Sequence, residues 1–274
     1  MAFGSTGNCC EAQSRWRTES KLQQTLSLLA RRLVALLVLG CLLSAGAEAQ
    51  SPANVPEPFT AIYAVTFRGI GGGNLIMQWR HDAQSGHYIF ETGANPSTLA
   101  RLFVSSDAYE RTTLEVTNDG VRPILWEAND GKSGDKNDGR LEFDWNAHKV
   151  TGTYEGKPVS LPLEPGMQDR QSLQIGSMMS LLRGEEPSKI EMVNGDSVRT
   201  YTYSRVKTES ITTKLGTFDT IVYESTRPGS NRVSRVWHAA ALGYIPVRAE
   251  QVRKGKVETV MELIELKKDD SAAK

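Results

Sequence analysis

The sequence predicts an all-β fold, mainly antiparallel, arranged as a β-sandwich or a partly open β-barrel with one main α-helix near residues 169–183. Three observations predict it. Roughly a dozen short segments have the alternation or the composition of β-strands. Turn residues, mainly Gly, Asn and Asp, separate these segments at short intervals. One longer segment lacks the period of two and has the apolar spacing of a helix.

Residues 59–67 form the clearest predicted strand. Their apolar side chains fall on one face, which indicates a half-buried antiparallel strand. The residues on that face are Phe59, Ala61, Tyr63, Val65 and Phe67. The same criteria predict further strands near residues 75–79, 88–92, 106–116, 121–127, 141–145, 150–154, 158–163, 189–193, 199–207, 210–214, 218–223, 232–237, 244–252 and 256–266.

Short turns and loops connect the predicted strands. Gly69–Gly73 is expected to form a glycine hairpin turn, and Lys254–Gly255 suits a two-residue hairpin. Asn95–Leu102 is expected to be a short helical turn, with Pro96 where the start of a helix tolerates proline. Asn129–Gly139 is the most polar segment, and its side chains do not follow the ligand spacing of a calcium loop. We therefore expect a mobile hairpin loop there.

The rhythm of strands changes once, between Asp169 and Gly184. The apolar residues of this segment cluster as they do on a helix, at Leu173, Ile175, Met178, Met179, Leu181 and Leu182. An N-terminal cap at Asp169 and a stop at Gly184 predict one helix of about three turns. An Asp there complements the positive helix end, and Arg170 can make a forked contact to a carboxylate or phosphate. Asp169 and Arg170 are thus candidate ligand-binding residues, the alternative being a cap and a structural salt bridge.

A second group of candidates lies on two neighbouring predicted strands. Val233, Arg235 and Trp237 share one face of the first strand, and Tyr244 and Arg248 follow on the second. Because arginine and aromatic side chains together can line the mouth of a ligand site, Arg235, Trp237, Tyr244 and Arg248 are candidate binding residues. The alternative is packing between strands, with Trp237 in the core. Arg248 would then lie at the surface, since it alternates away from the apolar residues of its strand.

The sequence contains no constellation that demands a particular chemistry. It has no H-E-x-x-H zinc motif, no G-x-S-x-G nucleophile elbow and no phosphate-binding Walker loop. Four histidines lack the spacing of metal ligands and are expected at the surface: His81, His87, His148 and His238. We therefore predict no catalytic residue, no metal site and no cofactor.

Composition narrows the class of protein further. Its 274 residues are enough for one or two ordinary domains, and 39% of them are hydrophobic. Lysine plus arginine and aspartate plus glutamate both number 32, so the formal net charge is zero. Because a nucleic-acid-binding domain usually shows a basic excess, we expect no nucleic-acid partner.

The N-terminus has the order of a secretory signal peptide. Arg31–Arg32 is a basic region, Leu33–Leu43 is an apolar run, and Ala47–Ala49 is an A-x-A cleavage site. The apolar run is about half the roughly 20 residues that a spanning helix needs. Val38–Cys41 loosely resembles a lipobox, whose cysteine becomes lipidated in lipoproteins. However, the apolar run continues past Cys41 to a better cleavage site, which favours a protein that is exported, cleaved and not membrane-spanning.

This leader sets the expected domain organisation. Residues 1–49 are a leader and signal peptide that is removed, residues 50–58 a Pro-rich linker, residues 59–266 one β-domain and residues 267–274 a polar tail. Removal of the leader also removes every cysteine of the chain, namely Cys9, Cys10 and Cys41. The mature protein is therefore expected to rely on its core, without disulfides.

Several short segments carry a resemblance to a known family. They are Gln168–Ser172, Leu215–Thr220, Trp237 with Leu242–Val247, and Phe143–Trp145. Together they resemble the bacterial family named domain of unknown function 3108, over nearly all of the mature chain. The resemblance implies an exported envelope protein of Gram-negative bacteria that is rich in β-structure. It brings no established activity, substrate or catalytic residue.

These observations predict an uncharacterised periplasmic envelope protein without catalytic activity. Its expected ligand is an apolar or amphipathic envelope molecule such as a lipid, or another envelope protein. Two alternatives stay open. One is a hydrolase that acts on an envelope polymer with Asp169 or another carboxylate as acid/base. The other is a scaffold without a small ligand, whose exposed strand edges serve as docking sites.

We predict cleavage after Ala49 on export. Intact-mass measurement of the exported protein should give a chain that starts at Gln50, and this chain should not react with thiol reagents. A chain that starts at a lipidated Cys41 would contradict the prediction and move the protein to a membrane leaflet.

Overall fold

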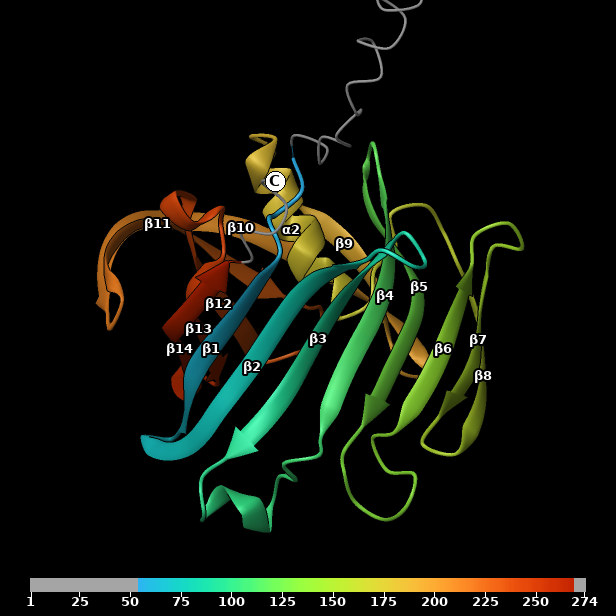
Figure 1. Cartoon of the computed structure of the whole chain (residues 1–274), viewed down its shortest axis with the longest axis horizontal. Helices are drawn as coiled ribbons and strands as arrows, with labels where there is room; N and C mark the ends of the chain where they lie inside the picture. The colour runs from blue at the N-terminus through green and yellow to red at the C-terminus, as the bar shows by residue number, and fades with distance from the viewer. Residues whose placement is uncertain (1–53, 269–274) are drawn as a thin grey trace, which may run out of the picture. The chain divides into compact units, whose positions relative to one another are not determined.

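The computed structural model describes residues 54–268, which fold into fourteen β-strands, one α-helix and two short 3-10 helices (Figure 1). The predicted signal peptide and cleavage site lie outside the described residues. Within the described range, no helix is both long and apolar enough to cross a bilayer. The elements are β1 (Phe59–Phe67), β2 (Ile70–Asp82), β3 (His87–Pro96), η1 (Ala100–Leu102), β4 (Tyr109–Thr117), β5 (Gly120–Asn129), β6 (Gly139–Asp144), β7 (Lys149–Tyr154), β8 (Lys157–Pro162), α2 (Ser172–Leu182), β9 (Lys189–Asn194), β10 (Ser197–Thr213), β11 (Gly216–Thr226), β12 (Arg232–Ala239), η2 (Ala240–Leu242), β13 (Pro246–Arg253) and β14 (Lys256–Lys268).

All fourteen strands belong to one sheet, in the order β8-β7-β6-β5-β4-β3-β2-β1-β14-β13-β12-β11-β10-β9. Every strand pair is antiparallel. The first strand, β1, pairs with the last strand, β14, near the middle of the sheet. The sheet curves, and α2 lies on its concave side (Figure 1). The predicted all-β antiparallel class with one helix is confirmed, and of the two architectures offered the partly open barrel is the one that forms.

Three hairpins turn on two residues that both have positive φ, the geometry of a type I′ turn. The central pairs are Arg68–Gly69 (φ 50° and 81°), Glu155–Gly156 (50° and 72°) and Lys254–Gly255 (49° and 73°). The Lys254–Gly255 hairpin is therefore confirmed. The glycine turn at 69–73 is shorter than predicted, because β2 already begins at Ile70. Gly73 lies inside β2, where a Cβ atom would approach the Asn95 carbonyl oxygen to 2.4 Å.

Other element boundaries also differ from the sequence prediction. The segments 199–207 and 210–214 are one continuous strand, β10, because a register shift between Arg205 and Lys207 lets pairing with β11 continue past the polar interruption. Tyr244 does not begin β13; its φ of 63° places it in the turn that follows η2. The predicted helical turn at 95–102 is reduced to η1, because β3 extends through Pro96.

Two apolar cores stabilise the fold. The main core joins the central strands to α2, with Tyr63, Trp79, Ile175 and Leu263 among its buried members. The alternation predicted for β1 is present, since Phe59, Ala61 and Tyr63 are all buried. The Trp79 indole also donates a hydrogen bond to the Pro56 carbonyl at 2.9 Å, which ties the residues before β1 to the sheet.

The second core brings the two ends of the sheet together. It contains Trp126 from β5 and Phe143 from β6, and also Val193 from β9 at the opposite end of the strand order. The segment between β8 and α2 bridges them, since the Val193 N–H donates to the Gln168 carbonyl at 2.8 Å. The barrel therefore closes through side chains and this segment, without pairing of β8 to β9.

Trp237 belongs to the main core, as the packing alternative predicted, and is 4% exposed. Arg235 and Arg248 lie over its ring at 5.9 and 5.6 Å, and its indole N–H donates to Glu209. Arg248, expected at the surface, is only partly exposed, because its guanidinium packs against the Trp237 ring and lies 2.8 Å from Glu250.

We predict that Trp237→Ala lowers the free energy of unfolding by about 3–5 kcal/mol, because it removes a buried aromatic side chain. Trp237→Phe is the matched control: it keeps a buried ring and loses the hydrogen bond to Glu209, so its cost should be smaller. Urea unfolding of both variants beside the parent measures the difference. A midpoint of Trp237→Ala equal to that of the parent would show that this ring does not support the core.

Candidate functional site

A chamber of about 630 Å³, partly open to solvent, is lined by residues of α2 and of the curved sheet. The lining residues come from the start and body of α2 and from strands β1 to β4 and β9 to β14. We call this space the inner chamber; its apolar lining residues are Tyr63, Leu75, Met77, Leu173, Met192, Val236, Pro246, Ala249 and Met261. Its polar lining includes Thr92, Glu110, Arg170, Gln171 and His238.

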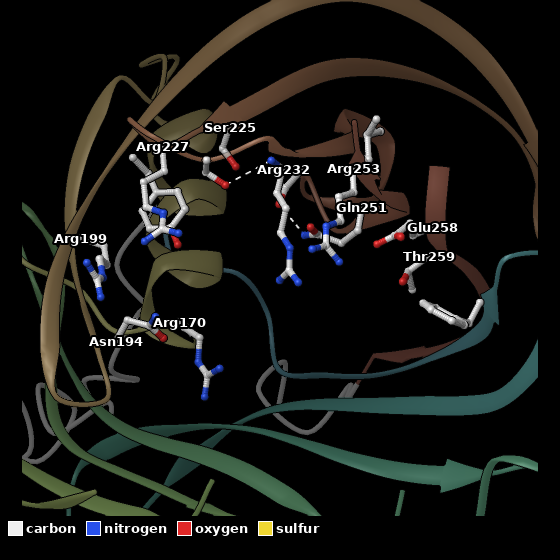
Figure 2. A pocket seen from close by; sticks show the side chains of 15 residues that line it. Arg170, Asn194, Arg199, Ser225, Arg227, Arg232, Gln251, Arg253, Glu258 and Thr259 are labelled. Carbon is white, nitrogen blue, oxygen red and sulfur yellow. Dashed lines mark hydrogen bonds between the residues drawn. The ribbon is translucent and has the colours of Figure 1, made fainter. Parts of the chain in front are cut away.

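A second space of about 640 Å³ adjoins the inner chamber and opens to solvent through exposed residues. The two spaces share the lining residues Arg170, Tyr201, Ser225, Ser234, Gln251 and Thr259. We call this second space the arginine mouth, after Arg170, Arg199, Arg227, Arg232 and Arg253 (Figure 2). Chamber and mouth together form one continuous cavity.

Strand register explains why the cavity changes in polarity along its length. In the mouth, Arg232 on β12 stands directly opposite Arg253 on β13. Two residues further along each strand, on the same face, lies a polar row that crosses four strands at Ser225, Ser234, Gln251 and Thr259. The next row on this face is apolar, with Val236, Ala249 and Met261 as cross-strand partners. Charged, polar and apolar rows thus follow one another from the opening inward.

The start of α2 places two further side chains at the cavity. Asp169 fixes this start: its Oδ1 accepts hydrogen bonds from the N–H groups of Gln171 (2.7 Å) and Ser172 (3.0 Å). The same oxygen accepts from the Thr112 hydroxyl of β4 at 3.0 Å, which joins the helix to the sheet. The predicted cap at Asp169 is therefore present. Its neighbours Arg170 and Gln171 line the inner chamber.

Asp169 is a carboxyl group held in a dry environment. The residue is 2% exposed, and its Oδ2 accepts no hydrogen bond from the described part of the chain. Burial raises the pKa of Asp169 to about 6, although the hydrogen bonds from Ser172, Gln171 and Thr112 act in the opposite direction. Asp169 does not line the chamber or the mouth.

Arg170 is held by an acidic and an aromatic partner. Its Nε donates to Glu110 Oε1 at 3.1 Å, and its guanidinium lies 5.8 Å from the centre of the Trp126 ring. The Trp126 indole donates to the same Glu110 oxygen at 2.7 Å. Arg170 thus forms the salt bridge expected of a structural residue and also lines both parts of the cavity.

His238 is buried at the inner end of the chamber, 7% exposed, where the sequence suggested a surface histidine. Its Nδ1 lies 2.9 Å from the Tyr244 carbonyl oxygen. Burial lowers the pKa of His238 to about 4, so the ring is neutral at physiological pH. The expected surface position is wrong because His238 lies on the same face of β12 as Ser234 and Val236, and this face lines the chamber.

The remaining sequence candidates lie elsewhere. Arg235, Trp237 and Arg248 are on the opposite, outer face of β12 and β13, where Arg235 contacts Glu224 at 2.5 Å and Glu250 at 3.4 Å. Neither they nor Tyr244 line the chamber or the mouth. Of the six candidates, the fold therefore brings only Arg170 to the cavity.

Sequence reasoning missed four arginines of the mouth: Arg199, Arg227, Arg232 and Arg253. The period of two could have identified Arg232, because it shares one strand face with Ser234 and Val236, opposite to the face of Arg235. Nothing local marks the other three, which come from separate strands and a loop. Among residues 54–268, no group of three or more His, Cys, Asp or Glu side chains has the arrangement of a metal site.

Comparison with known proteins agrees with the fold. The family model described as "Protein of unknown function (DUF3108)" matches residues 62–262, which confirms the resemblance drawn from the sequence segments. No curated protein matches the chain.

Three solved structures align with the chain at low sequence identity. A β-barrel-like protein of the domain of unknown function DUF1849 from Brucella abortus aligns with a TM-score of 0.51 and 15% identity, over 80% of this chain and 100% of that chain. An exported protein with a YmcC-like fold from Bacteroides fragilis aligns with a TM-score of 0.31 and 13% identity, over 80% and 100%. MucB in complex with MucA(peri) aligns with a TM-score of 0.32 and 10% identity, over 80% and 55%. The first of these similarities supports the fold alone.

We predict that Asp169 and His238 give opposite contributions to the pH dependence of stability. The raised pKa of Asp169 means that the folded state binds its proton more tightly, so its contribution falls as pH rises from about 4 to 6. The lowered pKa of His238 means that its contribution falls as pH drops from 6.5 to about 4. Each contribution amounts to roughly 3 kcal/mol at most.

Urea unfolding between pH 4 and 6.5 tests both signs. Relative to the parent, Asp169→Asn should gain stability as pH rises, and His238→Gln should lose it. Asparagine keeps an acceptor for the helix N–H groups, which makes Asp169→Asn the conservative choice. Stability curves of Asp169→Asn and the parent that stay parallel over this range would show that burial does not shift this carboxyl.

Proposed function

Since the chain belongs to the protein family of unknown function DUF3108, we propose its function from the cavity: the protein is a non-catalytic binder of an amphipathic molecule of the bacterial envelope. The observation that carries this proposal is the continuous cavity, apolar in the inner chamber and polar at the mouth. An amphipathic molecule has the same division into an apolar and a polar part.

The size and lining of the inner chamber support this proposal. Sites for small molecules typically enclose about 300–1,000 Å³ and are lined mainly by apolar side chains with a few polar groups. The chamber, at about 630 Å³, falls in that range. Three of its apolar lining residues are methionines, Met77, Met192 and Met261, whose flexible side chains adapt to ligands of differing shape.

The proposed periplasmic location of this binder is supported by the signal peptide predicted at residues 1–49. A protein in an aqueous compartment needs an enclosed apolar space to hold the apolar part of an envelope molecule away from water. The concave face of the curved sheet and α2 line such a space, which is partly open to solvent.

The two alternative functions have weaker support. A hydrolase that uses Asp169 as acid/base requires this carboxyl to meet a substrate, but it faces Thr112 and the helix start and lies outside the cavity lining. A scaffold that docks partners on strand edges would use β8 and β9, the two ends of the sheet. The backbone of β9 already bonds to Gln168, which leaves this edge less available.

We predict that Ala249→Phe abolishes or weakens binding of an apolar probe at least about tenfold, because the added ring occupies the inner chamber. The measurement is fluorescence titration with N-phenyl-1-naphthylamine, a neutral dye that brightens in apolar surroundings. Circular dichroism of the variant checks that the fold is kept.

Ala64→Phe is the matched control. Ala64 stands opposite Glu262, which contacts Arg248 on the outer face, so the same added ring lies outside the chamber. This variant should bind the dye like the parent. No binding of the dye by the parent, or equal loss in both variants, would overturn the proposal that the chamber receives the apolar part of a ligand.

A further inference from the structure

The arginine mouth carries an unbalanced positive charge. Five arginines line it against one acidic residue, Glu258. Glu258 is itself engaged by Arg68, whose Nη2 lies 2.6 Å from its Oε1. The Arg68 hydrogen bond is the main cause that lowers the pKa of Glu258, with smaller contributions from Arg253 and Arg232. One ionised carboxylate therefore faces five guanidinium groups.

Four of these arginines have no acidic partner of their own. Within residues 54–268, no carboxylate lies within 4.0 Å of the guanidinium groups of Arg199, Arg227, Arg232 and Arg253. Elsewhere on the sheet, Arg111, Arg140, Arg235 and Arg248 all have carboxylate partners. Among the described residues, Arg80, Arg101 and Arg122 also lack a carboxylate within 4.0 Å, so the mouth is distinguished by four such arginines that line one space.

The placement of these charges also works against stability. Arg232 and Arg253 are direct cross-strand partners, and like charges directly opposite on a sheet destabilise it. Figure 2 shows Arg170, Arg227 and Arg232 extending into one common space from different elements. A stability cost of this kind is offset when an anion lies between the cations.

We propose that the arginine mouth binds an anionic head group, a phosphate or a comparable oxyanion, of the amphipathic molecule whose apolar part occupies the inner chamber. This inference rests on the proposed function and narrows its ligand class. Arginine suits the role because its guanidinium donates paired hydrogen bonds to phosphate and carboxylate oxygens. The polar row at Ser225, Ser234, Gln251 and Thr259 then lies between head group and apolar part.

Two probes with the same apolar chain distinguish the contribution of the head group to affinity from that of the apolar chain. Dodecyl phosphate carries the anionic group, and dodecyl maltoside carries a neutral one; both are titrated calorimetrically below their micelle concentrations. The parent should bind dodecyl phosphate at least about tenfold more tightly, because hydrogen bonds to charged groups commonly contribute this much. This preference should decrease with added salt, as expected for partly exposed charges.

The double variant Arg232→Gln/Arg253→Gln tests the mouth itself. It should lose the preference for dodecyl phosphate and keep the affinity for dodecyl maltoside. Because it removes two opposed like charges, it should melt no lower than the parent. Arg122→Gln on β5 is the matched control, since Arg122 is exposed, does not line the cavity and packs on Trp145; it should keep the preference.

The outcomes distinguish this inference from the proposed function. Equal binding of both probes by the parent, or an unchanged preference in the double variant, would overturn the inference that the mouth binds an anionic head group. The proposal that the chamber binds an amphiphile would still stand. Binding of neither probe would overturn both. Inorganic phosphate alone is the third arm: affinity equal to that of dodecyl phosphate would show a site for free phosphate and would also overturn the inference.

Discussion

The hydrogen bonds of Asp169 are the interaction on which the arrangement of the site depends. One carboxylate oxygen accepts from the N–H groups of Gln171 and Ser172, where α2 begins, and from Thr112 on β4, so it fixes both the start of the helix and its position on the sheet. Arg170 and Gln171 come to the cavity as a consequence. A polar group buried at this depth is destabilising unless it is paired, and three hydrogen bonds to one oxygen offset much of that cost.

The second constraint is the closure of the sheet. An open sheet of fourteen strands has two ends, and its curvature brings them near each other without joining β8 to β9. Apolar side chains from both ends, among them Trp126 and Val193, share one core, and the chain between β8 and α2 bonds to β9. The closure of the barrel therefore depends on side-chain packing and on this segment instead of on strand pairing.

Because side chains alternate between the two faces of each strand, the lining of the cavity changes from charged through polar to apolar along its length. Residues two apart face the same side of a sheet, and on β12 the inward positions change from Arg232 through Ser234 to Val236. The outward positions of the same strand, Arg235 and Trp237, form a separate layer of stacked and ion-paired side chains. One strand therefore contributes to stability on one face and to the proposed ligand site on the other.

The sequence by itself determined the local features: the strand rhythm, the two-residue turn at Lys254–Gly255, the helix with its cap at Asp169, and the family. These follow from turn chemistry, period and capping, which act over a few residues. Only the tertiary structure decided which face of β12 meets the cavity, that β10 is continuous, and that His238 is buried. It also decided that arginines from distant segments share one mouth, because their proximity arises from cross-strand register and the curvature of the sheet, which no local pattern encodes.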